Sequence, residues 1–281
     1  MSYFFAGARK QLQGPVTLFL LAVFVCLAAC DNPKSTRNLR SRARDAAKGH
    51  VTPHPQSSVR SGVPRLAIIL DDFGTDRSAA ESVFALPYPL TLSFLPFHAN
   101  SREIAEEAHR RGYQVMLHLP MQSIGNEMPE AQQLHSGMTS SQISDFVSGM
   151  LQDVPYAVGV NNHQGSLATT DGPLMADLMA VLRERNLFFI DSRTTAATVA
   201  YAAAQDARIP CAFRNVPFLD DVEEVSAIRK QLQLALREAQ EKGEAIAIGH
   251  PHPETLRTLS EFLPQAEAQG VHLVHASELV H

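Results

Sequence analysis

The sequence has three cysteines among its 281 residues and no tryptophan. Cys26 and Cys30 lie in or directly after an apolar N-terminal stretch, so Cys211 alone remains for the rest of the chain. A disulfide framework is therefore excluded. With 45% hydrophobic residues and a mean hydropathy of −0.09, the composition is that of a globular protein rather than a disordered one.

Basic residues are scarce outside the N-terminal region. Ten of the 24 Lys and Arg residues, but two of the 29 acidic residues, lie at or before Arg65. The remaining sequence is acidic, so we expect no binding to nucleic acid. No glycine-rich phosphate loop and no GxGxxG motif follows any predicted strand, so we also expect no nucleotide cofactor.

The N-terminus has the layout of a targeting segment. Arg9 and Lys10 precede an uncharged apolar stretch, 16–29, that is short for a membrane span. The stretch ends in Leu-Ala-Ala-Cys30, which resembles the bacterial lipobox, whose cysteine is lipidated and becomes the first residue of the mature chain. An uncleaved signal anchor is the alternative. Both interpretations place the rest of the chain outside the cytoplasm on a membrane, and the resemblance implies, through Asp31, retention in the inner membrane.

A basic linker follows the lipobox. Residues 31–64 are rich in Ser, Pro, Arg and Lys and are predicted to be a disordered tether. Their basic side chains can contact anionic lipid head groups. The alternative is a solvated linker without such contacts. We therefore divide the chain into a signal peptide with lipobox (1–30), a tether (31–64) and a folded domain (65–281).

The folded domain begins with an apolar run that leads into two carboxylates. Residues 66–70 are apolar and branched, and Asp71, Asp72 and Gly74 follow. Such a run predicts a strand buried on both faces, as in parallel sheets covered by helices. Neighbouring side chains on an extended backbone point opposite ways, so one aspartate can hold a metal while the other handles a proton. A helix N-cap or a loop Asp pair is the alternative.

A unit of helix, glycine and strand recurs along the domain. Gly112, Gly243 and Gly270 each separate a predicted helix from a predicted strand. The predicted helices are 101–111, 223–242 and 255–269, and the predicted strands are 66–70, 90–95, 113–119, 157–160, 187–190, 211–213, 245–249 and 271–274. This alternation predicts an α/β fold, a distorted β/α barrel of seven to eight mostly parallel strands, with a doubly wound open sheet as the alternative.

Polar residues stand at the carboxyl ends of most of these strands, and a barrel brings all such ends to one mouth. They are Asp71 and Asp72, His118, the 161–166 segment with Asn162, His163 and Ser166, the 191–194 segment, the 213–221 segment, and His250. A single histidine at such a position is usually a helix cap or a packed residue. Several polar strand ends that converge on one face indicate a functional site instead.

The residue types at these ends suit a metal-dependent hydrolase. A carboxylate with two imidazoles is a common ligand set for a catalytic divalent ion, above all zinc, and Asp72, His118 and His163 can supply it. Asp71 can act as general base and His250 can protonate a leaving amine. The groups available to orient or tune these are Asn162, Ser166, Asp191, Arg193, Arg214 and Asp220. The predicted reaction is metal-assisted hydrolysis of an amide or ester.

Five motifs in order resemble the divergent polysaccharide deacetylases, relatives of the metal-dependent carbohydrate deacetylases. They are Asp-Asp-x-Gly at 71–74, His-Leu-Pro-Met at 118–121, Asn-Asn-His-x-Gly-Ser at 161–166, Asp-Ser-Arg-Thr at 191–194 and Gly-His-Pro at 249–251. The resemblance implies a distorted barrel of about seven strands and removal of N- or O-acetyl groups from glycans such as peptidoglycan or chitin. It also implies that Asp71 is the base, Asp72 a metal ligand and His250 the catalytic acid.

The sequence departs from the main deacetylases, which carry both metal histidines in one short motif. No second histidine follows His118 closely, so its partner is expected from the next strand, at His163. We expect a membrane-tethered, extracytoplasmic hydrolase that acts on an acetylated or amidated cell-envelope carbohydrate. The alternative is a catalytically weak or inactive barrel that binds an envelope glycan or a protein partner. The lack of tryptophan removes the usual stacking platform for a long glycan.

Overall fold

Strands and helices alternate throughout the part of the chain that the computed structural model describes, residues 62–125 and 130–281. The predicted lipobox cysteine, Cys30, and nearly all of the predicted tether lie outside the described residues. The strands are β1 (Arg65–Phe73), β2 (Thr91–Phe94), β3 (Gln114–Met121), β4 (Gly159–Gln164), β5 (Phe188–Asp191), β6 (Cys211–Phe213), β7 (Glu244–Gly249) and β8 (His272–Val274). The α-helices are α1 (Arg77–Val83), α2 (Ser101–Arg110), α3 (Ser140–Asp153), α4 (Gly172–Glu184), α5 (Ala200–Asp206), α6 (Val225–Lys242) and α7 (Pro253–Ala268).

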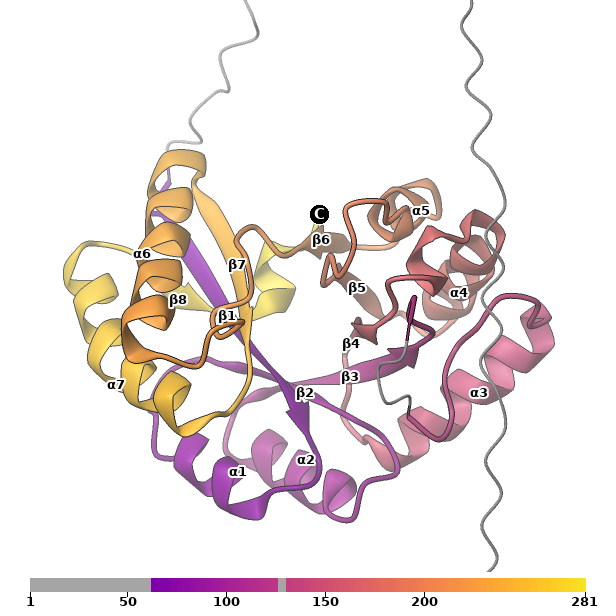
Figure 1. The fold of residues 1–281 in the computed structure, drawn as a ribbon, viewed down its shortest axis with the longest axis horizontal. Helices are drawn as coiled ribbons and strands as arrows, with labels where there is room; N and C mark the ends of the chain where they lie inside the picture. The colour runs from indigo at the N-terminus through magenta and orange to yellow at the C-terminus, as the bar shows by residue number, and fades with distance from the viewer. Residues whose placement is uncertain (1–61, 126–129) are drawn as a thin grey trace, which may run out of the picture. The chain divides into compact units, whose positions relative to one another are not determined.

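The strands form one parallel sheet that curls into a nearly closed barrel, with the helices around it (Figure 1). Their order is β6-β5-β4-β3-β2-β1-β7, and every strand pair is parallel. β8 pairs with β1 at Arg65 to Ala67, before the β1–β2 pairing begins at Ile69. The prediction of a distorted β/α barrel is therefore confirmed, and the open-sheet alternative is wrong.

The barrel closes between β6 and β7 without a strand pair. The backbone N–H of Asn215 donates to the carbonyl of Ile246, whose own N–H donates to Oδ1 of Asn215 at 2.7 Å. At the other end of the seam, Cys211 exchanges two backbone hydrogen bonds with His281. A side-chain amide and the backbone of His281 thus take the place of ladder partners for β6 along this seam.

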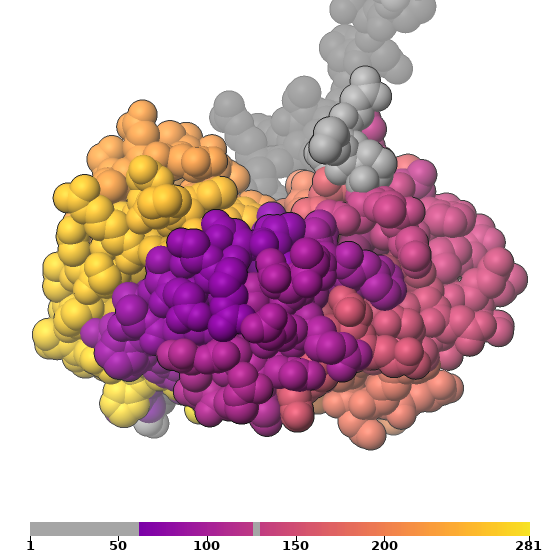
Figure 2. Space-filling view, turned by 90° about the horizontal axis from the view of Figure 1, so that it is seen from below, coloured from indigo at the N-terminus to yellow at the C-terminus, as the bar shows by residue number. Residues whose placement is uncertain are grey.

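Alternation of side chains along β1 supplies two hydrophobic cores. Leu66, Ile68 and Leu70 pack outward against the helices, whereas Ala67 and Ile69 pack inside the barrel. Both faces are buried, as the unbroken apolar run predicted. Figure 2 shows the start of the domain (indigo) lying between the C-terminal region (yellow) and the region that follows β3 (pink), in agreement with the strand order.

Local signals for helix ends agree with the sequence. Gly243 ends α6 in a left-handed conformation, with φ of 90°, and its N–H donates to the carbonyl of Ala239. A capping box between Thr139 and Gln142 begins α3, at the Thr-Ser-Ser-Gln sequence that is typical of one. Among the described helices, none is long and apolar enough to cross a bilayer.

Candidate metal centre and active site

A cavity of ≈310 Å³ opens where the carboxyl ends of the strands meet. The residues that line it come from the ends of β1, β3, β4 and β7 and from the loops after β3 to β6. They are Asp71, Asp72, His118, Ser123, Asn162, His163, Gln164, Ser166, Thr194, Phe218, Asp221 and His250. The predicted metal ligands, base and acid all lie in this one cavity.

A bulge at the end of β1 brings both aspartates to the cavity. The register of the β1–β2 pair shifts between Leu70 and Phe73, and Asp72 has a left-handed backbone with φ of 62°. Two consecutive side chains therefore reach the same space, although regular strand geometry predicts that they point apart. Neither caps the following helix, because Asp76 is the N-cap of α1.

Asp72, His118 and His163 present three ligand atoms in a small triangle. Oδ1 of Asp72 lies 3.2 Å from Nε2 of His118 and 3.1 Å from Nδ1 of His163, and the two nitrogens are 3.2 Å apart. Around a tetrahedral zinc ion with bonds of about 2.0–2.2 Å, ligand atoms are separated by roughly 3.3–3.6 Å. The triangle is therefore close to the size that zinc requires.

The protonation chemistry of the triangle also fits a cation. Oδ1 of Asp72 is buried and accepts no hydrogen bond from any described residue. Burial by itself would raise the pKa of Asp72, but the imidazoles of His118 and His163 outweigh it and hold the pKa far below its usual range. A buried, ionised and unsatisfied oxygen between two imidazoles is the donor set of a divalent metal site, and the three residues fit zinc.

Asp71 occupies the floor of the cavity beside the triangle. It is 1% exposed, and its Oδ2 lies 3.6 Å from Nε2 of His118. Both of its oxygens accept hydrogen bonds from Nδ2 of Asn161, at 2.9 and 3.1 Å. Burial raises the pKa of Asp71, and the nearby histidines only partly offset this. A carboxylate in such an environment is a stronger base than one in water.

His250 lies on the other side of Asp72. Its Nε2 is 3.8 Å from Oδ2 of Asp72, and its Nδ1 is 2.9 Å from Oδ1 of Asp220. Asp220 also accepts hydrogen bonds from the backbone N–H of His250 and from the hydroxyl of Thr255. Burial lowers the pKa of His250, but the carboxylates of Asp220 and, to a lesser extent, Asp71 and Asp72 outweigh it and raise the pKa to about 9. His250 is therefore charged at neutral pH and can donate a proton.

The remaining predicted residues fall into two groups. Asn162 and Ser166 line the cavity, and Oδ1 of Asn162 accepts the backbone N–H of Ser192. Asp191, Arg193 and Arg214 do not line it.

These three residues shape the loops behind the cavity. Asp191 accepts hydrogen bonds from the N–H of Arg193 and the hydroxyl of Thr198. Arg193 stacks on Phe213, and Arg214 donates to three backbone carbonyl groups.

The prediction from sequence placed the 161–166 and 213–221 segments at the mouth but gave no role to Asn161, Phe218 or Asp221 within them, and it missed Ser123 altogether. Asn161 precedes His163 by two positions in β4, so strand periodicity places the two on one face, and that signal could have found it. Phe218 and Asp221 lie in the loop after β6, where no periodicity applies.

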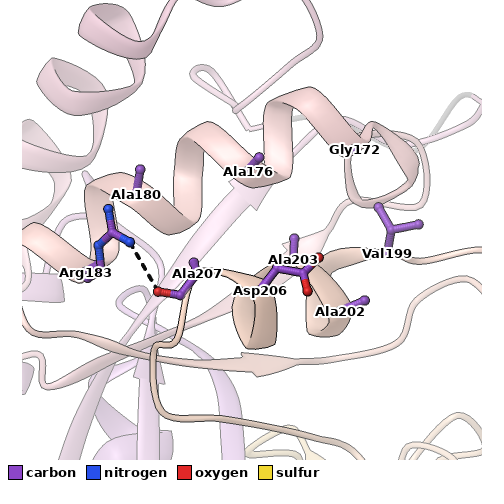
Figure 3. Close-up of a pocket in the computed structure, with 9 residues that line it drawn as sticks. All are labelled: Gly172, Ala176, Ala180, Arg183, Val199, Ala202, Ala203, Asp206 and Ala207. Carbon is purple, nitrogen blue, oxygen red and sulfur yellow. Dashed lines mark hydrogen bonds between the residues drawn. The ribbon is translucent and has the colours of Figure 1, made fainter.

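A larger cavity, of ≈460 Å³, lies away from this chemistry, between α4 and α5. Figure 3 shows it lined by alanines, with Arg183 bonded to the carbonyl of Ala207 at one end. Its charged residues, Arg183 and Asp206, belong to an otherwise apolar wall. Catalysis needs several convergent polar groups, and the strand-end cavity is therefore the candidate site although it is the smaller one.

Comparisons with known proteins agree with this assignment. The sequence profile of the divergent polysaccharide deacetylases matches residues 68–280. The uncharacterized protein YibQ of Escherichia coli K12 is 38% identical over 216 residues, which are 77% of this chain and 67% of that protein.

A second relative and a solved structure add to the comparison. An uncharacterized protein of Haemophilus influenzae is 37% identical over 199 residues, 71% of each chain. The crystal structure of an uncharacterized protein from Agrobacterium tumefaciens C58 shares the fold, with a TM-score of 0.74 at 22% identity over 79% of this chain and 91% of that one. From the extent of the profile match and the identity of the relatives, the chain belongs to the divergent polysaccharide deacetylase family.

Proposed function

We propose that this protein is a zinc-dependent deacetylase that hydrolyses an amide or ester of an acetylated cell-envelope carbohydrate. The observation that carries the proposal is the arrangement around Asp72. The triangle with His118 and His163 has the size of a zinc site, and a buried base and a charged acid flank it. Structural zinc sites have four protein ligands, whereas this triangle has three and leaves a position free for water and substrate.

Each residue has a defined part in the reaction. A zinc ion held by Asp72, His118 and His163 would polarise the acyl carbonyl group and make water more acidic. Asp71 takes a proton from the attacking water while the oxygen of that water bonds to the acyl carbon. Nε2 of His250 gives a proton to the nitrogen, or ester oxygen, of the leaving sugar as the acyl bond breaks. The products are acetate and the free amine or hydroxyl group.

The character of the cavity supports a neutral, polar substrate. Among the lining residues there is no Lys or Arg, and Asp221 adds a carboxylate to the wall. A phosphate or carboxylate group near the reacting atoms would therefore meet repulsion from these carboxylates, with only His250 and the metal as counter-charges. An acetylated amino sugar carries hydroxyl and amide groups that match the hydroxyl groups of Ser123 and Thr194.

The test begins with protein purified without chelators. We expect one divalent ion per chain and the release of acetate from at least one member of a panel of acetylated amino sugars and peptidoglycan fragments. Acetate release should fall about 10²–10⁴-fold in the Asp71→Asn variant. Folded protein that holds no divalent ion under saturating zinc would contradict the proposal and favour a barrel that only binds a glycan or a protein partner.

We also propose that the domain acts outside the cytoplasm, as an inner-membrane lipoprotein. The support is the lipobox that ends at Cys30 and the adjoining Asp31. Replacement of the cysteine, Cys30→Ala, should leave an uncleaved precursor that incorporates no labelled fatty acid. Wild-type protein that is cleaved at another position and found in the soluble fraction would contradict the anchor.

A further inference from the structure

We propose that Asn161 is a positioning residue that couples the general base to the metal site. Its amide nitrogen holds the carboxylate of Asp71, and its amide oxygen keeps the proton of His118 on Nδ1, so that Nε2 faces the metal. This inference rests on the proposed function for the identity of the base and the ligand. It goes further by assigning a role to a residue that touches neither the substrate nor the ion.

Asn161 lies in the middle of the buried polar groups behind the cavity. It is fully buried in β4, and it is paired across the sheet with His118 in β3. Oδ1 accepts hydrogen bonds from the hydroxyl of Ser93 at 2.5 Å and from Nδ1 of His118 at 2.9 Å. Nδ2 donates to both oxygens of Asp71 and, at 3.2 Å, to the hydroxyl of Ser192. All the hydrogen-bonding capacity of this side chain is used.

The orientation of the amide follows from Asp71. An ionised carboxylate accepts hydrogen bonds and cannot donate them, so the NH₂ group of Asn161 must face it. The reverse orientation would place Oδ1 about 3 Å from two carboxylate oxygens in a buried site, where repulsion is poorly screened. The amide oxygen therefore faces Ser93 and His118.

The orientation of the amide in turn determines the tautomer of His118. Oδ1 of Asn161 has no proton to give, so Nδ1 of His118 must be the donor in their 2.9 Å contact. The neutral imidazole then has its lone pair on Nε2, the atom that lies 3.2 Å from Oδ1 of Asp72. A partner that fixes the tautomer of a metal-binding histidine in this way raises metal affinity.

A neutral amide is the group that serves both neighbours. An aspartate at 161 would keep an oxygen for His118 but would place a second carboxylate against Asp71. A leucine, which is similar in size, would remove both contacts. The two substitutions therefore separate the two roles: Asn161→Leu should impair both the metal site and the base, whereas Asn161→Asp should impair the base alone.

The first measurement is zinc affinity, by competition with a chromophoric chelator. We expect Asn161→Leu to bind zinc about 10–100-fold more weakly than wild type. Asn161→Asp should bind zinc at least as tightly as wild type and yet release acetate far more slowly. The matched control is Asn215→Leu, which also removes a structural amide, at the β6–β7 seam, without touching Asp71 or His118. It should lower thermal stability and leave zinc affinity unchanged.

The second measurement needs no variant. In metal-free protein labelled with ¹⁵N-histidine, at a pH where the His118 imidazole is neutral, nitrogen NMR should show the proton on Nδ1. A proton on Nε2 would overturn the inference, as would wild-type zinc affinity in folded Asn161→Leu. These failures leave the proposed function intact. Failure of the wild-type protein to bind zinc would refute the proposed function instead, and the tautomer measurement would still decide whether Asn161 orients His118.

Discussion

Asp220 holds His250 at two points: one carboxylate oxygen lies 2.9 Å from Nδ1 of the ring, and the other accepts the backbone N–H at 2.6 Å. The ring therefore donates its Nδ1 proton to Asp220 and turns Nε2 towards the cavity. Because Asp220 is buried and ionised, it also favours the charged imidazolium. Asp220 therefore orients the proposed acid and makes the largest contribution to its charge, to which Asp71 and Asp72 add.

The first prediction follows from that contact. The pKa of His250 is raised from 6.5 to about 9, so the charged acid is present below that pH and is lost as pH rises through it. Asp220→Asn keeps the shape and removes the charge, and we expect the alkaline limb of the rate profile to move to lower pH. Glu223→Gln, which alters a surface contact to His252, is the control and should leave the limb in place. An unmoved limb in Asp220→Asn would refute the role of Asp220.

The second prediction concerns the glycine before His250. A Cβ atom on Gly249 would lie 3.1 Å from Oδ2 of Asp220 and 3.1 Å from Cβ of Leu219. Gly249→Ala should therefore displace Asp220, shift the alkaline limb in the same direction as Asp220→Asn but by less, and cost about 1–3 kcal/mol of stability. Denaturant unfolding and the pH profile together test it.

The control for this substitution is Gly149→Ala. Gly149 lies in α3, and a methyl group added there would meet no atom within 4 Å, so the variant should gain about 1 kcal/mol from helix propensity. Its pH profile should match that of the wild type. A Gly249→Ala protein with wild-type stability and pH profile would contradict the prediction that a Cβ atom at this position displaces Asp220.

Local patterns allowed the fold to be predicted. The apolar run 66–70 identifies a doubly buried strand, and a glycine such as Gly243 marks the point where a helix must end because the backbone there is left-handed. Such local patterns could not predict how the barrel closes. Closure depends on Asn215 and His281 reaching strands far away in the sequence, and neither contact has a local signature.

The candidate site was predictable to a similar extent. Parallel strands bring their carboxyl ends together, so the proximity of Asp72, His118 and His163 follows from the order of strands. The left-handed backbone at Asp72 comes from a register shift against β2, which periodicity alone does not predict. Asn161 stood within the quoted 161–166 motif but received no role, because a buried amide becomes informative only when its partners are known.

The third prediction concerns the metal ligands. Asp72→Ala, His118→Ala and His163→Ala should each lose most bound zinc on dialysis, because each removes one of three ligand atoms that lie within 3.2 Å of one another. The loss of zinc affinity should exceed the decrease of about 10–100-fold that is typical when a residue that only hydrogen-bonds to a metal ligand is replaced. His135→Ala is the control: that histidine is exposed and contacts the carbonyl of Ser136. Equal zinc content in all four proteins, by elemental analysis, would refute the assignment.

The last prediction separates proton transfer from metal binding. Neither Asp71 nor His250 belongs to the triangle, so Asp71→Asn and His250→Ala should keep zinc and fold normally. Each should still lower the rate by about 10²–10⁴-fold, the usual contribution of a general base or acid.

The pH profile distinguishes the general base from the general acid. Asp71 must be ionised to act as base. Because burial raises its pKa, activity should fall as pH drops through that raised pKa. His250 must be charged to act as acid, so activity should also fall as pH rises through about 9. The wild-type profile should therefore be bell-shaped, and each substitution should remove one limb of the residual activity. A structural role for Asp71 would instead lower stability and leave the turnover of folded protein unchanged. Zinc-loaded Asp71→Asn protein that releases acetate at the wild-type rate would eliminate the mechanism.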